Sequence, residues 1–171
     1  MDQSAQHASR QSRQRVLAIS SGGGHWIELR RLRPAWQGCN VTYATAHPGY
    51  REEVEAEPDP EGARVRFFWF PEANRWQKLR LAGQLLTIIW ILIRVRPQVI
   101  VSTGSSPGYF AVRLGRMLLG ARTIWIQSIA DTEGMSLSGQ LAGKHADLWL
   151  TQWAHLAQKE KNGPRCEGSV I

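Results

Sequence analysis

Cysteine is scarce in this sequence, which contains only Cys39 and Cys166 among its 171 residues. Two distant thiols exclude a disulfide framework, and they fit no metal or redox spacing. Long apolar runs are also missing. The longest runs from Leu81 to Ile93 and has 13 residues, whereas a helix needs roughly 20 to span a bilayer. We therefore expect no metal site and no membrane-spanning segment.

The first residues, "MDQSAQHASRQSRQ", lack an apolar core and so form neither a signal peptide nor a membrane anchor. We expect residues 1–14 to be a disordered polar tail. The remaining residues, 15–171, are enough for a single domain with a substantial core. A content of 43% hydrophobic and 20% charged residues is typical of a globular chain.

Acidic residues are absent between positions 73 and 130, where eight arginines and lysines occur. Six acids are instead concentrated within residues 52–61, and the net charge of the whole chain is +7. Such asymmetry indicates a face that meets an anionic partner, either nucleic acid, phospholipid or a phosphorylated substrate. A solvated basic surface without a partner would give the same pattern.

Short apolar segments alternate with helical patterns along the chain. The expected strands cover residues 15–20, 40–45, 64–70, 98–103, 122–127 and 147–152. The expected helices cover residues 25–33, 75–95, 109–119 and 137–146, with a last helical turn near the C-terminus. This alternation predicts a Rossmann-like α/β fold, in which helices cover both faces of a parallel sheet. Right-handed crossovers then place every strand-to-helix loop along one edge of that sheet.

Three of these loops are rich in glycine and hydroxyl side chains. They are "SSGGGH" (20–25), "TGSSPG" (103–108) and "QSIADTEGMSLSG" (127–139). Open parallel sheets bind ligands at the carboxyl ends of their strands, and the N-terminus of a helix that follows such a loop favours an anion. The three loops together predict a site for a ligand that carries a phosphate or a diphosphate.

The first loop matches neither of the familiar nucleotide-binding motifs. It lacks the Lys-Ser/Thr ending of a P-loop, and its glycines are not spaced as in a dinucleotide-binding fold. No acid follows the strand at 40–45 to hold a ribose, so an NAD enzyme is disfavoured and we expect no cofactor. Nucleic acid is also disfavoured, because the basic residues are mixed with a strongly apolar helix rather than with exposed stacking platforms.

That helix, "RWQKLRLAGQLLTIIWILIRVR" (75–96), has cationic ends and is apolar nearly all round its second half. A helix that only packs on a sheet needs one apolar stripe. The excess apolar surface predicts partial insertion among anionic lipid head groups; the alternative is a crossover helix that is simply buried. The expected membrane contacts are Arg75, Trp76, Lys78, Arg80 and Trp90.

Several motifs carry a resemblance to a known family. An "SGGH" loop precedes a helix with leucine and arginine, a "STG" turn follows a central strand, and an "SLSG" motif precedes a strand that opens with an acid and ends in "QW". The matching residues are Ser21, Gly23, Gly24, His25, Glu28, Leu29, Ser102 to Gly104, Ser136 to Gly139, Asp147, Gln152 and Trp153. In these motifs, and in its closing "EGSVI", the chain resembles the acceptor-side, membrane-recruiting subunit of the two-part transferase that adds N-acetylglucosamine to a dolichol-linked sugar. It resembles the bacterial exopolysaccharide counterparts of that subunit still more, over residues 15–171.

The resemblance implies the N-terminal half of a GT-B glycosyltransferase, and it extends to the N-terminal domain of the single-chain enzyme that makes the peptidoglycan precursor lipid II. It implies a lipid-linked diphosphate sugar as acceptor, and His25 as the proposed base. The acceptor-binding residues that it implies are Gly22, Gly23, Gly24, Glu28, Thr103, Gly104, Ser105, Ser106, Gln127, Ser128, Ser136, Ser138 and Gly139. The alternative for His25 is a helix-start residue that only hydrogen-bonds the loop.

The same resemblance implies partners and a place in the cell. A length of 171 residues leaves no room for a donor-binding domain, so we expect a separate glycosyltransferase subunit that binds most of the nucleotide sugar. The pair would act in polysaccharide or oligosaccharide biosynthesis, bound peripherally to the cytoplasmic face of the inner (plasma) membrane. Two alternatives remain: a non-catalytic scaffold for that partner, and a free-standing enzyme acting on a small phosphorylated metabolite.

Two positions depart from the family pattern. Gln127 stands where many relatives have an acid, and Asp131 stands where relatives more often have arginine or asparagine. A role in proton transfer at position 127 is therefore disfavoured, and so is phosphate binding by the loop that contains Asp131.

Overall fold

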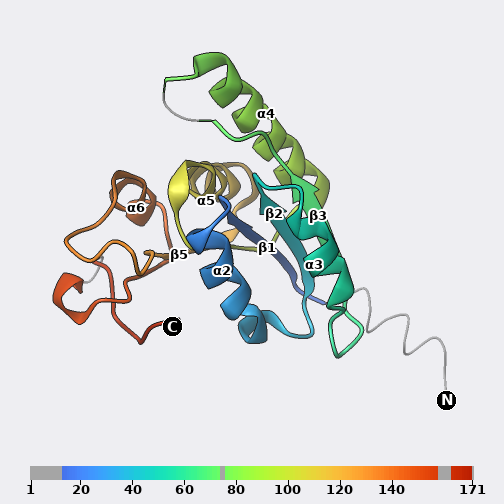
Figure 1. Cartoon of the computed structure of the whole chain (residues 1–171), viewed down its shortest axis with the longest axis horizontal. Coiled ribbons are helices and arrows are strands. Elements are labelled where there is room, and N and C mark those ends of the chain that lie inside the picture. The colour runs from blue at the N-terminus through green and yellow to red at the C-terminus, as the bar shows by residue number, and fades with distance from the viewer. Residues whose placement is uncertain (1–12, 74–75, 158–162, 171) are drawn as a thin grey trace.

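The computed structural model describes residues 13–73, 76–157 and 163–170. Within these ranges, six parallel strands form one sheet in the order β3-β2-β1-β4-β5-β6 (Figure 1). The strands are β1 (Arg15–Ser20), β2 (Asn40–Thr45), β3 (Val65–Trp69), β4 (Val99–Ser102), β5 (Arg122–Ile126) and β6 (Leu148–Leu150). The strand order reverses direction between β1 and β4, which is the ligand-binding position of a doubly wound sheet. The predicted fold class is confirmed. Most of the tail expected at 1–14 lies outside the described residues.

The helices agree with the predicted pattern in most places. They are α2 (Gly24–Arg31), α3 (Tyr50–Ala56), α4 (Lys78–Val95), α5 (Ser105–Leu119) and α6 (Leu137–Gly143), with 3-10 turns η1 (Arg33–Trp36) and η2 (Ala154–Leu156). Helix α5 begins four residues before the predicted start at 109. Pro107 is accommodated in its first turn, where a missing N–H breaks no helical hydrogen bond. Helix α3 was not predicted.

Side chains on alternate residues of the sheet enter two separate cores. Leu17 and Ile19 of β1 lie in the core beneath α4, α5 and α6. Val16 and Ala18 point to the opposite face, where they lie in the core with residues of α2, η1 and α3. This period of two is what a parallel strand buried on both faces requires. The sheet is therefore covered by helices on both faces, as predicted.

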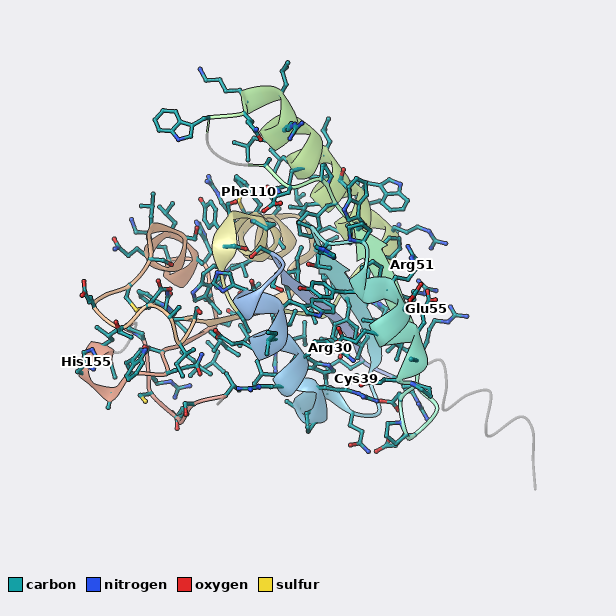
Figure 2. The ribbon with its side chains drawn as sticks, in the orientation of Figure 1. Arg30, Cys39, Arg51, Glu55, Phe110 and His155 are labelled. Atoms are coloured by element: carbon teal, nitrogen blue, oxygen red, sulfur yellow. The ribbon has the colours of Figure 1, made fainter. Side chains whose placement is uncertain are left out.

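The acidic segment 52–61 contributes to helix α3 and is partly neutralised by basic residues of the neighbouring α2 and η1. Arg30, which Figure 2 labels, pairs with Glu53 (3.0 Å) and Glu57 (2.6 Å), and Arg33 also pairs with Glu57. These ion pairs therefore compensate Arg30 and Arg33 and tie the acidic segment to α2 and η1.

Helix α4 carries two apolar rows, one on each side. The inward row is buried in the core and includes Ile88, Ile91, Leu92 and Val95. The outward row is exposed and consists of Leu79, Leu86, Trp90 and Ile93. The first turns of the helix project past the sheet (Figure 1), and the side chain of Leu79 is 91% exposed. Among the described residues, no helix is both long and apolar enough to cross a bilayer.

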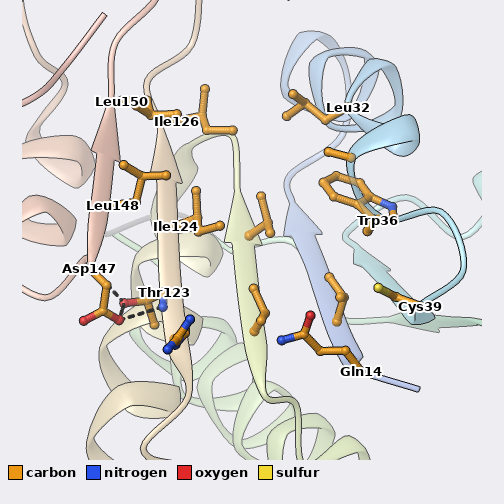
Figure 3. A pocket seen from close by; sticks show the side chains of 15 residues that line it. Gln14, Leu32, Trp36, Cys39, Thr123, Ile124, Ile126, Asp147, Leu148 and Leu150 are labelled. Carbon is orange, nitrogen blue, oxygen red and sulfur yellow. Dashed lines mark hydrogen bonds between the residues drawn. The ribbon is translucent and has the colours of Figure 1, made fainter. Parts of the chain in front are cut away.

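One strip of the sheet lacks a helix of its own in the described ranges. From β1 the chain adds β2 and β3 on one side of the sheet through α2 and α3, whereas from β4 it adds β5 and β6 on the other side through α5 and α6. With right-handed crossovers, these two pairs of helices lie on opposite faces of the sheet. On the α2 side, a groove of about 680 Å³ remains over β1, β4, β5 and β6. Figure 3 shows Ile124 and Ile126 of β5 and Leu148 and Leu150 of β6 along one side of it. Leu32, Trp36 and Cys39 line the other side. We call this strip the bare groove.

The amino-terminal end of β6 is fixed to β5 by one carboxylate. Asp147 accepts hydrogen bonds from the backbone N–H (2.8 Å) and the hydroxyl (3.1 Å) of Thr123, and it pairs with Arg116. Burial alone would raise the pKa of Asp147, but the hydrogen bonds from Thr123 and the charge of Arg116 lower it overall. The ionised form of Asp147 therefore stabilises the fold.

Candidate functional site

The two glycine-rich loops that follow β1 and β4 lie side by side, because these strands are neighbours in the sheet. They are joined directly: the N–H of Ser21 donates to the hydroxyl of Ser105 at 3.2 Å. Each loop opens a helix, α2 after the first and α5 after the second. The structure thus brings together the first two of the three loops that the sequence predicts to bind an anion.

His25 bridges the two loops. Its Nδ1 lies 3.1 Å from the carbonyl oxygen of Thr103, whose hydroxyl in turn donates to the carbonyl of His25 at 2.6 Å. A carbonyl can only accept, so Nδ1 carries a proton in this arrangement, and Nε2 of the neutral ring keeps its lone pair. The imidazole is half-buried. The geometry leaves Nε2 available as a proton acceptor.

Gly104 makes room for this imidazole. A Cβ at this position would lie 2.5 Å from Cε1 and 2.6 Å from Nδ1 of His25. The backbone also has φ 143° and ψ −174°, a conformation that essentially only glycine adopts. Both the space and the backbone angles therefore require glycine here, and they tie the second loop to the position of His25.

Backbone N–H groups provide the hydrogen-bond donors of this site. In α2, the N–H groups of Trp26 and Ile27 bond to the carbonyl of Gly23, so those of Gly24 and His25 precede the helical hydrogen bonds. At the start of α5, the N–H groups of Ser105 and Ser106 occupy the equivalent places. Neither loop contains lysine or arginine. An anion here would be held by helix N-termini rather than by cationic side chains.

Gln127, from the third predicted loop, is fully buried and its amide is occupied within the protein. Its Oε1 accepts from Trp125 Nε1 (3.1 Å), and its Nε2 donates to Ser136 Oγ (2.8 Å) and to Asp131. The Ser136 hydroxyl also accepts from the N–H of Gly139 at 3.1 Å and thereby caps α6. The "SLSG" motif thus begins a helix and covers Gln127. Ser138 is half-buried, and its side chain has no hydrogen bond in the described ranges.

Glu28 is buried and links several strand ends. It accepts hydrogen bonds from Ser128 Oγ (2.7 Å) and from Gln152 Nε2 (2.8 Å), and its carboxylate lies 3.4 Å from the N–H of Ile129. Gln152 in turn accepts from the N–H of Val170 at 2.8 Å. Glu28 and Ser128, both predicted to bind the acceptor, bond to each other, and Glu28 holds α2 against the ends of β5 and β6.

A third strand end, which the sequence analysis did not single out, borders the first loop. The hydroxyl of Tyr50, the first residue of α3 after the loop that follows β2, accepts from the N–H of Gly23 at 3.3 Å. The Tyr50 ring stacks on Trp26 with centroids 4.9 Å apart, and His47 lies against it at 4.7 Å. This segment has no glycine-rich pattern; the signal that could have found it is its place after a strand on the ligand-binding edge.

No cluster of three or more histidine, cysteine, aspartate or glutamate residues that could hold a metal ion occurs in the part of the chain that the structure describes.

The fold and the paired loops define one half of a GT-B glycosyltransferase fold. Among solved structures, MurG of Acinetobacter baumannii is similar with a TM-score of 0.63 and 10% identity, over 91% of this chain and 44% of that one. S. aureus MnaA in its structure with UDP has the same TM-score and identity, over 92% of this chain and 44% of that one. A UDP-N-acetylglucosamine 2-epimerase described from Listeria monocytogenes has a TM-score of 0.56 with 12% identity, over 82% of this chain and 40% of that one. The chain spans less than half the length of these structures.

The family model described as "Oligosaccharide biosynthesis protein Alg14 like" matches residues 76–166, and the chain belongs to this family. The UDP-N-acetylglucosamine transferase subunit ALG14 of Eremothecium gossypii is 29% identical to this chain. The match covers 91% of this chain and 80% of that protein. Family and fold confirm the predicted resemblance and support a glycosyltransferase subunit.

Proposed function

We propose that this chain is the acceptor-side subunit of a two-component glycosyltransferase, which transfers a sugar from a nucleotide donor to a lipid-linked diphosphate acceptor. The observation that carries this proposal is His25, held between two glycine-rich loops at the point where the strand order reverses. Membership of the Alg14-like family supports it, as does the relative named a UDP-N-acetylglucosamine transferase subunit. The product would enter oligosaccharide or polysaccharide biosynthesis.

The chemistry follows from the donors and acceptors at the loops. The diphosphate of the acceptor would bind the N–H groups of Gly24, His25, Ser105 and Ser106, where two helix N-termini favour negative charge. Nε2 of His25 would take the proton from the attacking sugar hydroxyl as its oxygen bonds to the anomeric carbon of the donor and the nucleotide diphosphate leaves. The carbonyl of Thr103 accepts from Nδ1 and so stabilises the resulting imidazolium. Such general-base assistance is typically worth about 10²- to 10⁴-fold in rate.

The donor sugar requires a second domain, since the similar solved structures are more than twice as long as the part that this chain matches. We propose that a separate chain supplies it, because the ALG14 relative is itself named a transferase subunit. We propose that the partner chain packs on the bare groove, whose apolar residues have no helix above them in the described ranges.

The outward row of α4 would bind the membrane. Leu79, Leu86, Trp90 and Ile93 form an apolar stripe along the helix, and Lys78, Arg80 and Arg94 place cations at its two ends. This combination suits a helix that lies in the plane of an anionic lipid surface. We place the subunit peripherally on the cytoplasmic face of the inner (plasma) membrane. Of the expected contacts, Arg75 lies outside the described residues, and Trp76 is exposed beside the first turn of α4.

Reconstitution with and without a partner tests the function. The full chain is assayed alone, and after co-expression with a donor-binding glycosyltransferase chain of the same organism, with radiolabelled UDP-N-acetylglucosamine and vesicles that contain a lipid-linked diphosphate sugar. We expect transfer only by the pair. Transfer by the chain alone would contradict the two-component proposal and support the free-standing enzyme. Transfer by the pair that is unaffected by His25→Ala would support a scaffold without chemistry of its own.

A further inference from the structure

We propose that Tyr50 is both a positioning residue and a direct contact of the acceptor site, so that a third strand end completes it. The inference rests on the proposed function, because it concerns the anion that the first loop would bind. It is carried by the geometry around the Tyr50 hydroxyl, in a segment that no motif of the sequence marks.

Tyr50 fixes the backbone of the first loop. Gly23 has φ 67° and ψ −138°, a conformation open to glycine and strained for other residues. Its N–H is the one loop donor that bonds to Tyr50, at 3.3 Å. This bond fixes the Gly22–Gly23 peptide, which leads directly into the N–H groups of Gly24 and His25. Tyr50 therefore acts on the anion-binding donors through Gly23.

The ring of Tyr50 is itself held in place. It lies parallel to Trp26, with 7° between the ring planes, and Trp26 is fully buried in the core beneath α2. His47 also contacts the Tyr50 ring. It lies near Gly22 of the first loop, where an added Cβ would be 3.5 Å from the Cβ of His47. A side chain that is fixed by stacking loses little further freedom when it binds a ligand.

The Tyr50 hydroxyl keeps one unused bonding group. A phenol that accepts from an N–H still has its own O–H to donate. In the ranges that the structure describes, no residue accepts from this hydroxyl. Its position beside Gly23 brings this donor to the edge of the loop where the acceptor would bind. We infer that it donates to an oxygen of the diphosphate or of the first sugar.

The sequence offers a matched control in Tyr43. The Tyr43 hydroxyl accepts a hydrogen bond from the indole Nε1–H of Trp36 at 3.0 Å in the buried core. The Tyr50 hydroxyl likewise accepts from one N–H, that of the Gly23 backbone. Tyr50→Phe and Tyr43→Phe therefore delete the same atom and leave one N–H without its acceptor. Only the first change removes a group that faces the loop.

The experiment is a titration of the isotopically labelled full chain with inorganic pyrophosphate, followed by the NMR shifts of the Gly24 and Ser105 amides. We expect Tyr50→Phe to weaken binding by roughly tenfold or more, the loss typical of a hydrogen bond to a charged group. Tyr43→Phe should lower the melting temperature and leave the affinity unchanged. In the assembled transferase, Tyr50→Phe should raise KM for the acceptor and leave KM for the nucleotide sugar unaltered.

The outcomes separate the two proposals. If the wild-type amides shift saturably and Tyr50→Phe binds with equal affinity, the role of Tyr50 is overturned and the anion site stands. If Tyr43→Phe weakens binding as much as Tyr50→Phe, the effect is one of general stability, and the role of Tyr50 is again overturned. If the wild-type amides show no saturable shift, the diphosphate site of the proposed function fails, and the inference fails with it.

Discussion

Replacing Gly104 by alanine should disable the site while leaving the fold intact. The new methyl group would lie about 2.5 Å from the imidazole of His25, far inside van der Waals contact, and the ring would have to leave the carbonyl of Thr103. The backbone at φ 143° and ψ −174° adds roughly 1–3 kcal/mol of strain for a residue with a Cβ. For a chain of this size, each kcal/mol lowers the melting temperature by about 2–4 °C.

A matched variant separates the clash from the strain. Gly120, the C-cap of α5, also has a positive φ of 62°, but nothing lies within 4 Å of a Cβ built there. Gly120→Ala should cost about 1–2 kcal/mol for the left-handed backbone alone. Both variants should melt earlier than the wild type, as followed by circular dichroism.

Only Gly104→Ala should lose transfer in the reconstituted pair, by roughly 10²-fold or more, as expected also for His25→Ala. NMR spectra of the imidazole nitrogens should show a protonated Nδ1 in the wild type and a changed tautomer balance in Gly104→Ala. Near-normal transfer by Gly104→Ala would refute the reasoning that places His25 in the chemistry. An equal loss in Gly120→Ala would show that stability, and not the position of His25, controls the rate.

Three further changes test other parts of the structure. The double change Lys78→Glu and Arg80→Glu should weaken binding to anionic vesicles, measured by co-sedimentation at low salt, by at least about tenfold, since each basic residue near such a surface contributes about 1 kcal/mol. Equal binding of the wild type to neutral vesicles, or binding that salt does not affect, would contradict an electrostatic contribution. Ile124→Lys should abolish co-purification with the donor-binding chain while the isolated subunit stays folded by circular dichroism, although it melts somewhat earlier because the half-buried Ile124 packs against the core. Retained co-purification would place the partner elsewhere. Burial raises the pKa of Asp147 in the folded protein, but the hydrogen bonds from Thr123 and the guanidinium of Arg116 lower it overall. The ionised carboxylate therefore contributes stability above its unfolded pKa of about 3.9, and this stability is lost as the pH falls through the folded value. Asp147→Asn should therefore melt earlier at pH 7 and lose less stability on acidification, and an unchanged acid profile would exclude this contribution.

The sheet and its loops could be predicted from the sequence because their signals are local. Each apolar run bounded by glycine or proline became a strand, and the alternation with helices fixed the parallel arrangement. Helix α3 was missed because its stabilising contacts are not local: Val54 is its one fully buried side chain, and Glu53 and Glu57 find their cations on α2. A run of acids without those partners reads as a solvated loop.

The site was predicted in part. His25 and Gly104 lie together as a switch-point site requires, but Gln127 and Glu28, which the resemblance placed among the ligands, are buried in hydrogen bonds within the protein. Sequence spacing cannot distinguish a polar side chain that faces a ligand from one that faces the next loop. Tyr50 was missed for the opposite reason, because stacking on Trp26 depends on the pairing of β1 with β2 and leaves no local pattern.

The bare groove has a consequence for how much of this protein a cell can hold. In the described ranges Ile124, Leu148 and Leu150 are only half-buried, so a subunit without the proposed partner would present them to chaperones, to proteases and to other copies of itself. A partner that binds only the folded chain would stabilise it by mass action, by about 2.7 kcal/mol when its free concentration is 100 times the Kd. If the proposed partner binds there, we expect the abundance of this subunit to follow that of the partner, so that overproducing this chain alone yields aggregated or degraded protein.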